Sequence, residues 1–256
     1  MKRADGVLIV LLVVSVAVTL VFGVLDVIPY ADATMGRLIS ETVPRLAVGG
    51  FLITLMVTRG FGKTFTPKWS GAQLLWSVPC LLVAIVNFPF AALISGTAVI
   101  ERTDLIWLFL LKCVSIALVE EIFFRALLLP LFMERLQKNR HAVLISVLLT
   151  SALFAVMHLI NLFFGAGIGE TMLQVGYTFL IGCMLAVMLL KTKNIWLCII
   201  THALFDFGGT IVTDLGSGVF QDTVFWILTA IAGVLCAVHI IWSLIRIIKE
   251  KACRVI

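Results

Sequence analysis

The chain has 256 residues, of which 62% are hydrophobic and 13% are charged, and its mean hydropathy is +1.17. Soluble globular domains contain about 45–50% apolar and about 25% charged residues, so the composition excludes an ordinary soluble domain and indicates an integral membrane protein. The formal net charge of +5 comes from Lys and Arg in short segments between apolar runs, which argues against nucleic acid as a partner.

Apolar runs between polar or Gly/Pro breaks predict an all-α polytopic membrane protein with about eight transmembrane helices, forming a single membrane domain over residues 1–256. The predicted spans, in chain order, are 6–28, 44–60, 71–96, 104–132, 141–164, 170–190, 195–213 and 223–247. The first run follows a basic start, as in a signal peptide, but it exceeds the roughly 7–15 apolar residues of a signal sequence. We therefore expect a retained first helix.

The distribution of Lys and Arg predicts the orientation of these spans. With both the N-terminus and the C-terminus cytoplasmic, fourteen of the nineteen basic residues lie in cytoplasmic segments: Lys2, Arg3, Arg59, Lys63, Lys68, Arg135, Lys138, Arg140, Lys191, Lys193, Arg246, Lys249, Lys251 and Arg254. Arg37, Arg45 and Arg102 are then expected in outer loops, and Lys112 and Arg125 within spans. Short basic loops on one side are typical of a multi-pass protein of the bacterial cytoplasmic membrane.

Ionisable residues within the predicted spans mark the candidate functional positions, because a charge at bilayer depth costs about 2.5–3.5 kcal/mol on insertion scales. They are Lys112, Glu120, Glu121 and Arg125 in span 104–132, His158 with the polar Asn161 in span 141–164, His202 and Asp206 in span 195–213, and His239 in span 223–247. The spacing of these residues along each helix predicts which of them share a face.

Glu121 and Arg125 are separated by four residues, so they can pair on one helix face. Glu120 lies about 100° round the helix and is left free to point into a cavity. His158 and Asn161 also share a face, and we take Asn161 as a supporting residue. Together with His202 and Asp206, three helices can converge a Glu, two His and an Asp on one buried point. Such a group can activate water and stabilise developing negative charge, as amide hydrolysis requires.

Three motifs in these spans resemble those of the CAAX protease and bacteriocin-processing family of intramembrane endopeptidases, which includes the Ras-converting CAAX endopeptidase. EEIFFR at 120–125 is similar to the family's EExxxR motif, FAVMH at 154–158 to FxxxH, and HALFD at 202–206 to HxxxN/D. The motifs occur in the expected order, and the resemblance identifies about 104–213 as the catalytic core.

The resemblance implies that Glu120 is the general base that activates water, assisted by His158. It also implies that Glu121 and Arg125 hold the helix and orient Glu120. From the residues alone, a purely structural pair that locks two helices is an equal alternative for Glu121 and Arg125.

His202 and Asp206 would then stabilise the oxyanion of the tetrahedral intermediate. The eukaryotic enzymes have Asn at the second of these positions, and an ionised Asp cannot donate a hydrogen bond. Either Asp206 is protonated, or it orients His202, which then donates alone; we favour the second. A water-filled cavity that opens toward the cytoplasm is expected around these groups.

Two other classes of function remain open. The first is a zinc protease, because Glu120, His158, His202 and Asp206 are all competent ligands, although HExxH is absent. A metal-dependent enzyme would use Glu120, His158 and His202; otherwise we expect no cofactor. The second is a non-catalytic immunity, binding or transport protein that uses the polar cluster to hold a peptide or a proton.

The remaining residues carry weaker signals. Cys198 precedes His202 by one turn, as a nucleophile precedes its base, but an apolar Cys is more often a packing residue. The six cysteines show no CxxC spacing and predict neither disulfides nor a thiolate metal site. His239 is interpreted as a packing residue and His141 as interfacial, whereas Lys112 either snorkels or pairs with a carboxylate.

The expected partners are a peptide or protein substrate at the membrane and the lipid bilayer itself. In a bacterium, maturation of a peptide bacteriocin or pheromone, or self-immunity to one, fits the resemblance better than a prenylated CAAX substrate. The sequence carries no signal of oligomeric state.

Overall fold

The computed structural model describes residues 30–67 and 69–253, without the side chains of 59 and 251–253. The predicted first span, 6–28, lies outside the described residues. The described helices are α2 (Ala33–Met56), α3 (Gly71–Val86), α4 (Phe90–Ser95), α5 (Ile106–Glu121), α6 (Leu129–Arg135), α7 (Ala142–Met157), α8 (Ile168–Thr192), α9 (Ile195–Leu215) and α10 (Thr223–Cys253). The fold is therefore all-α, as predicted.

Short irregular helical turns and one strand pair connect these helices. The turns are the π turns η1 (Val57–Phe61) and η4 (Ile122–Leu128) and the 3₁₀ turns η2 (Gly62–Thr64), η3 (Thr103–Leu105) and η5 (His158–Phe164). Strand β1 (Ala98–Ile100) pairs antiparallel with β2 (Gly216–Gly218), which ties the loop before α5 to the loop after α9.

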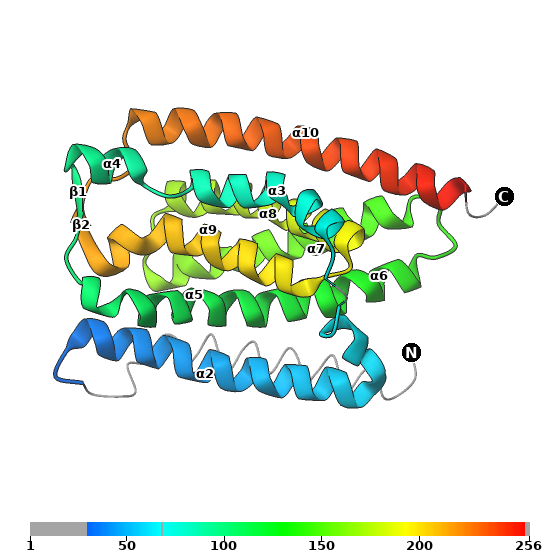
Figure 1. The fold of residues 1–256 in the computed structure, drawn as a ribbon, viewed down its shortest axis with the longest axis horizontal. Coiled ribbons are helices and arrows are strands. Elements are labelled where there is room, and N and C mark those ends of the chain that lie inside the picture. The colour runs from blue at the N-terminus through cyan, green and yellow to red at the C-terminus, as the bar shows by residue number, and fades with distance from the viewer. Residues whose placement is uncertain (1–29, 68, 254–256) are drawn as a thin grey trace.

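The long helices lie roughly side by side (Figure 1), with α2 and α10 on opposite sides of the bundle. Helix α5 packs against both α2 and α9, and α8 packs against both α7 and α10. The buried apolar core runs through α5, α8 and α9 and includes Phe109, Leu185 and Ile199. This arrangement places the three motif-bearing segments in the interior of the bundle.

Within the described residues, five helical segments are long and apolar enough to cross a membrane: 33–56, 142–164, 168–192, 195–215 and 223–250. Helix α3 is apolar but shorter. The predicted run 71–96 is divided into α3 and α4, because Asn87 ends α3 and Pro89 follows it. The count of eight spans and the cytoplasmic termini stay predictions.

Helix α2 begins eleven residues before the predicted span 44–60, so the assignment of Arg37 and Arg45 to an outer loop is wrong. Asp32 caps the helix by accepting a hydrogen bond from the Met35 N–H at 3.0 Å. Arg102 donates to both carboxylate oxygens of Asp32, at 3.1 and 2.6 Å, and lowers the pKa of that carboxyl to about 2.

A largely buried ion cluster explains how the polar first half of α2 packs against α5 and α9. The Lys112 ammonium on α5 lies 2.9 Å from Glu41 Oε2 and 3.1 Å from Asp214 Oδ1. Arg37 donates to the same Asp214 oxygen, and Arg45 lies 3.8 Å from Glu41. Lys112 therefore pairs with carboxylates of α2 and α9, which is one of its two predicted roles.

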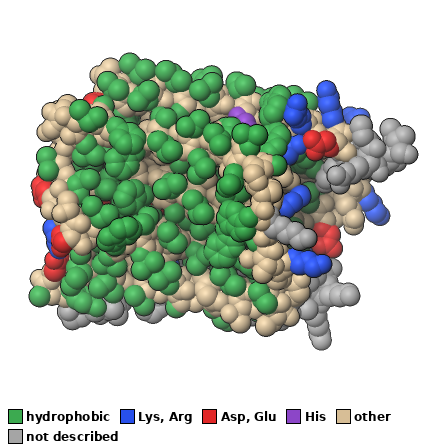
Figure 2. All heavy atoms as spheres, viewed as in Figure 1, with side chains coloured by type: hydrophobic (Ala, Val, Ile, Leu, Met, Phe, Trp, Pro, Cys, Tyr) green, Lys and Arg blue, Asp and Glu red, His purple; other side chains and the backbone are tan. Residues whose placement is uncertain are grey.

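One end of the molecule is rich in Lys and Arg, whereas apolar side chains cover most of the length of the face in view (Figure 2). Helices α6, α8 and α10 all end at this basic end, and α2 runs toward it (Figure 1). The β1–β2 pair lies at the opposite end.

We expect Lys112→Met to lower the free energy of unfolding by about 3–5 kcal/mol, because two carboxylates then lose a buried cationic partner. Thermal or denaturant unfolding of the detergent-purified protein measures the change. Asp104→Asn is the control, since Asp104 pairs with Arg102 at the surface with its side chain 62% exposed, and it should change stability little. Equal unfolding midpoints for both variants would contradict the structural role of the cluster.

Candidate active site

Glu121, Arg125 and His202 meet in the interior, where their exposed fractions are 0%, 2% and 4%. Glu121 Oε1 lies 3.0 Å from Arg125 Nη1 and 2.8 Å from His202 Nδ1. The predicted pairing of Glu121 with Arg125 is therefore present. One carboxylate oxygen joins the end of α5, the π turn η4 and helix α9.

The chain winds as the π turn η4 directly after Glu121. Single π turns inside α-helices are rare in proteins as a whole, and those that do occur are often found at functional sites. Helical structure continues without a break through most of the predicted span 104–132. The hydrophobic pattern of the sequence did not predict that part of it would be a π turn. The Arg125 guanidinium is enclosed by two rings, 4.4 Å from the Phe154 centroid and 5.7 Å from that of Phe124.

The second nitrogen of His202 faces two further carboxylates. His202 Nε2 lies 3.6 Å from Glu120 Oε2 and 3.5 Å from Asp206 Oδ2. Both distances exceed a direct hydrogen bond, so the contacts are electrostatic and leave the second nitrogen available to another molecule. The Glu120 and Asp206 side chains are 23% and 24% exposed, unlike the enclosed Glu121.

This geometry differs from the favoured sequence interpretation of Asp206. The hydrogen bond at His202 Nδ1 comes from Glu121, whereas Asp206 approaches the other nitrogen. Glu121, rather than Asp206, is thus placed to fix the ring orientation and tautomer of His202.

His158 follows α7 directly, and its Nδ1 lies 3.0 Å from the Phe154 carbonyl oxygen. The Phe154 ring stands edge-on to both imidazoles, at 5.2 Å from His158 and 5.7 Å from His202. Asn161 donates to Gln174 Oε1 at 2.8 Å and so links η5 to α8. The histidines of two motifs therefore both contact the phenylalanine that begins the FAVMH motif.

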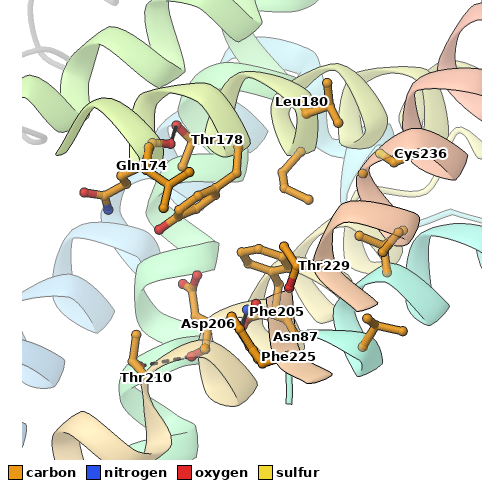
Figure 3. A pocket seen from close by; sticks show the side chains of 18 of the residues that line it. Asn87, Gln174, Thr178, Leu180, Phe205, Asp206, Thr210, Phe225, Thr229 and Cys236 are labelled. Atoms are coloured by element: carbon orange, nitrogen blue, oxygen red, sulfur yellow. Dashed lines mark hydrogen bonds between the residues drawn. The ribbon is translucent and has the colours of Figure 1, made fainter. Parts of the chain in front are cut away.

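A cavity of about 210 Å³ adjoins these groups. His158, His202 and Asp206 line it, and side chains of α8, α9 and α10 point into it (Figure 3). The lining continues to Phe220 and Gln221, which follow β2 at the end opposite the basic segments. The cavity thus extends away from the basic end, whereas the sequence led us to expect an opening toward it.

The sequence analysis missed the uncharged polar residues of this cavity, notably Asn87, Gln174 and Tyr177. Asn87 and Gln174 each interrupt an apolar run, and that signal was available. Cys198 does not line the cavity; its Sγ lies 3.5 Å from the Leu185 carbonyl oxygen, in keeping with a packing residue.

A metal site requires several ligands that converge on one point. Over the described residues, no group of three or more His, Cys, Asp or Glu side chains has an arrangement that could hold a metal ion. Both imidazoles use Nδ1 for contacts within the protein, which leaves Nε2 of each free of a direct hydrogen bond. The expectation that the protein needs no metal stays a prediction.

The site therefore gathers three carboxylates, a guanidinium and two histidines between apolar helices. Residues 102–208 match the family described as Type II CAAX prenyl endopeptidase Rce1-like. Neither the curated proteins nor the solved structures contain a match to the chain. The match includes all three motifs, so the resemblance stated from the sequence is confirmed. The matched family is a peptidase family, and the apolar helices indicate an integral multi-pass membrane protein.

Arg125→Ala should lower the free energy of unfolding by about 3–5 kcal/mol, because it leaves the Glu121 charge buried without its cation. Denaturant unfolding in detergent measures this loss. The double variant Glu121→Gln/Arg125→Met removes both charges and should recover part of it. If the single variant were as stable as wild type, Arg125 would not be neutralising Glu121.

Proposed function

We propose that the chain is an intramembrane endopeptidase that hydrolyses a peptide bond of a membrane-associated peptide or protein. The observation that carries this proposal is the approach of Glu120 and Asp206 to His202 Nε2, at 3.6 and 3.5 Å, beside a cavity that His202 and Asp206 line. A base, a fixed imidazole and room for substrate are the parts that amide hydrolysis requires.

Glu120 is the proposed general base. Its partly exposed carboxylate accepts a proton from a water molecule as the water oxygen attacks the scissile carbonyl carbon. The carbonyl oxygen becomes the oxyanion of a tetrahedral intermediate. When the C–N bond breaks, the departing nitrogen takes up the proton held by Glu120, which restores the carboxylate.

His202 is the proposed oxyanion stabiliser. In its imidazolium form, Nδ1–H donates to Glu121 Oε1 at 2.8 Å, and Nε2–H is left to donate to the oxyanion. Arg125 holds Glu121, and packing fixes the ring before reaction, so the donor needs no reorganisation as charge develops.

His158 and Asp206 complete the proposed catalytic group. With Nδ1–H donated to the Phe154 carbonyl, His158 has Nε2 as an acceptor that can help to position water for Glu120. Asp206 lies 3.5 Å from His202 Nε2 and lines the cavity, so a hydrogen-bond donor at its side-chain position would reach the same oxyanion.

The proposed reaction needs no metal, and the proposed location is the bacterial cytoplasmic membrane. The substrate class is a membrane-associated peptide, of CAAX type or a bacteriocin or pheromone precursor. The family match and the apolar helices support a membrane peptidase, and the finer assignments are part of this proposal.

Cleavage of a mixed peptide library by the detergent-purified protein tests the catalytic role of Glu120. We expect Glu120→Gln to lower kcat by at least about a hundredfold, because the amide cannot act as base. Chelator should leave wild-type cleavage unchanged. Glu134→Gln, which changes an exposed Glu of α6, is the matched control and should cleave normally.

Three outcomes would contradict this proposal in different ways. Loss of wild-type cleavage with chelator, restored by zinc, would indicate a metalloprotease. Full cleavage by Glu120→Gln would remove the general base. A cellular immunity or maturation phenotype that is unchanged in Glu120→Gln would indicate a binding protein.

Asp206→Asn should keep kcat within about tenfold of wild type, because an amide supplies a hydrogen-bond donor at the same place. The side chain in Asp206→Leu carries neither a charge nor a hydrogen-bond donor, so kcat should fall by about 10²–10³-fold. Steady-state kinetics on one library-derived peptide compares the two variants. Equal losses in both would show that the negative charge itself is required.

A further inference from the structure

The cavity follows one face of α9 beyond the proposed catalytic group. His202, Asp206 and Gly209 all line it, and their spacing of four and three residues places them on one side of the helix. From His202 to Thr210, the last α9 residue in the lining, the rise is about 12 Å at 1.5 Å per residue. The cavity is therefore an elongated space that begins at the site and runs away from the basic end.

The walls of this space are neutral. Apart from His158, His202 and Asp206, the described lining residues carry no charged side chain. Gln174 and Thr178 on α8 belong to one wall of this space, and Asp206 and Thr210 on α9 and Thr229 on α10 belong to the walls below it in the view (Figure 3). Apolar walls with scattered amide and hydroxyl groups suit a chain that offers backbone N–H and C=O groups but no charge.

Asn87 contributes a fixed amide to this space. Its Nδ2 donates to the Phe205 carbonyl oxygen at 2.7 Å, which uses one of its two amide hydrogens. A Cβ at Gly209 would lie 2.5 Å from this nitrogen, and one at Gly208 would lie 3.0 Å from the backbone of Phe88. The Gly208–Gly209 pair thus lets the end of α3 approach α9, one turn beyond Asp206.

We propose that this cavity binds an extended, uncharged segment of about two substrate residues on one side of the scissile bond, since its volume of about 210 Å³ is only moderately larger than the roughly 150 Å³ that holds one benzene molecule. Asn87 provides a main-chain contact, and the segment enters from the end opposite the basic helix termini. This inference rests on the proposed peptidase function and names the substrate subsite of that same site.

Gly233 on α10 offers a direct steric test. It lines the cavity, and a Cβ at this position would meet no atom within 4 Å, so a larger side chain fills the cavity without a clash at its attachment point. Gly50 on α2 is equally open but exposed, and α2 lies on the side of the bundle opposite α10. The same substitutions at Gly50 are the matched control.

The first measurement is binding without turnover. Glu120→Gln protein is incubated with two fluorescent peptide libraries, one uncharged and one that carries Lys and Asp. We expect capture of the uncharged library, with affinity that falls through Gly233→Ala, Gly233→Leu and Gly233→Phe and is weakened by on the order of tenfold or more in the last. The Gly50 series should bind as the parent does, and unchanged unfolding midpoints confirm folding of every variant.

The second measurement uses wild-type cleavage. Removing residues one at a time from one end of a cleaved peptide should raise KM over about two positions next to the scissile bond, and Gly233→Phe should no longer respond to that truncation. Binding that Gly233→Phe leaves unchanged, preferential capture of the charged library, or no capture of either library overturns the subsite. If Glu120→Gln loses cleavage but substitutions at Gly233 leave peptide binding unchanged, the peptidase proposal is supported and the subsite inference is refuted.

Discussion

The site depends on a single carboxylate oxygen, Glu121 Oε1, which contacts both Arg125 and the Nδ1 of His202. An unpaired charge at this depth would cost several kcal/mol, so Glu121 and its cation are held together. Because His202 shares the same oxygen, the pair that balances charge also fixes the imidazole. The ion pair and the candidate catalytic histidine thus form one physical unit, and neither the structural nor the functional interpretation of Glu121 excludes the other.

A second ion cluster plays a different part. Lys112, Glu41 and Asp214 join α2, α5 and α9 toward the end of the bundle that carries the β1–β2 pair. The two clusters bind α5 at two positions along its axis, at Lys112 and at Glu121, and the segment between them is largely apolar. Charges that are expensive in a membrane therefore fix the axial position of α5 against its neighbours, which an apolar interface alone specifies poorly.

The sequence predicted the all-α membrane class and the membership of the polar group, because ionisable residues in apolar runs are conspicuous and helical spacing sorts them by face. It did not predict the contacts of His202, since spacing within one helix says nothing about which carboxylate of another helix reaches which nitrogen. Glu121 rather than Asp206 takes Nδ1 for this reason. The start of α2 was missed because Arg37 and Glu41 resemble loop residues until their partners on other helices are known.

The close packing at Gly208 and Gly209 has a consequence for which substitutions the bundle can accept. The corner between α3 and α4 lies against these glycines and is bonded through Asn87 to Phe205. This corner and the middle of α9 are therefore in direct contact, although more than a hundred residues separate them in the sequence. A side chain larger than glycine at 208 or 209 would collide with this corner, so a segment that carries none of the three motifs limits which residues the helix with HALFD can hold there.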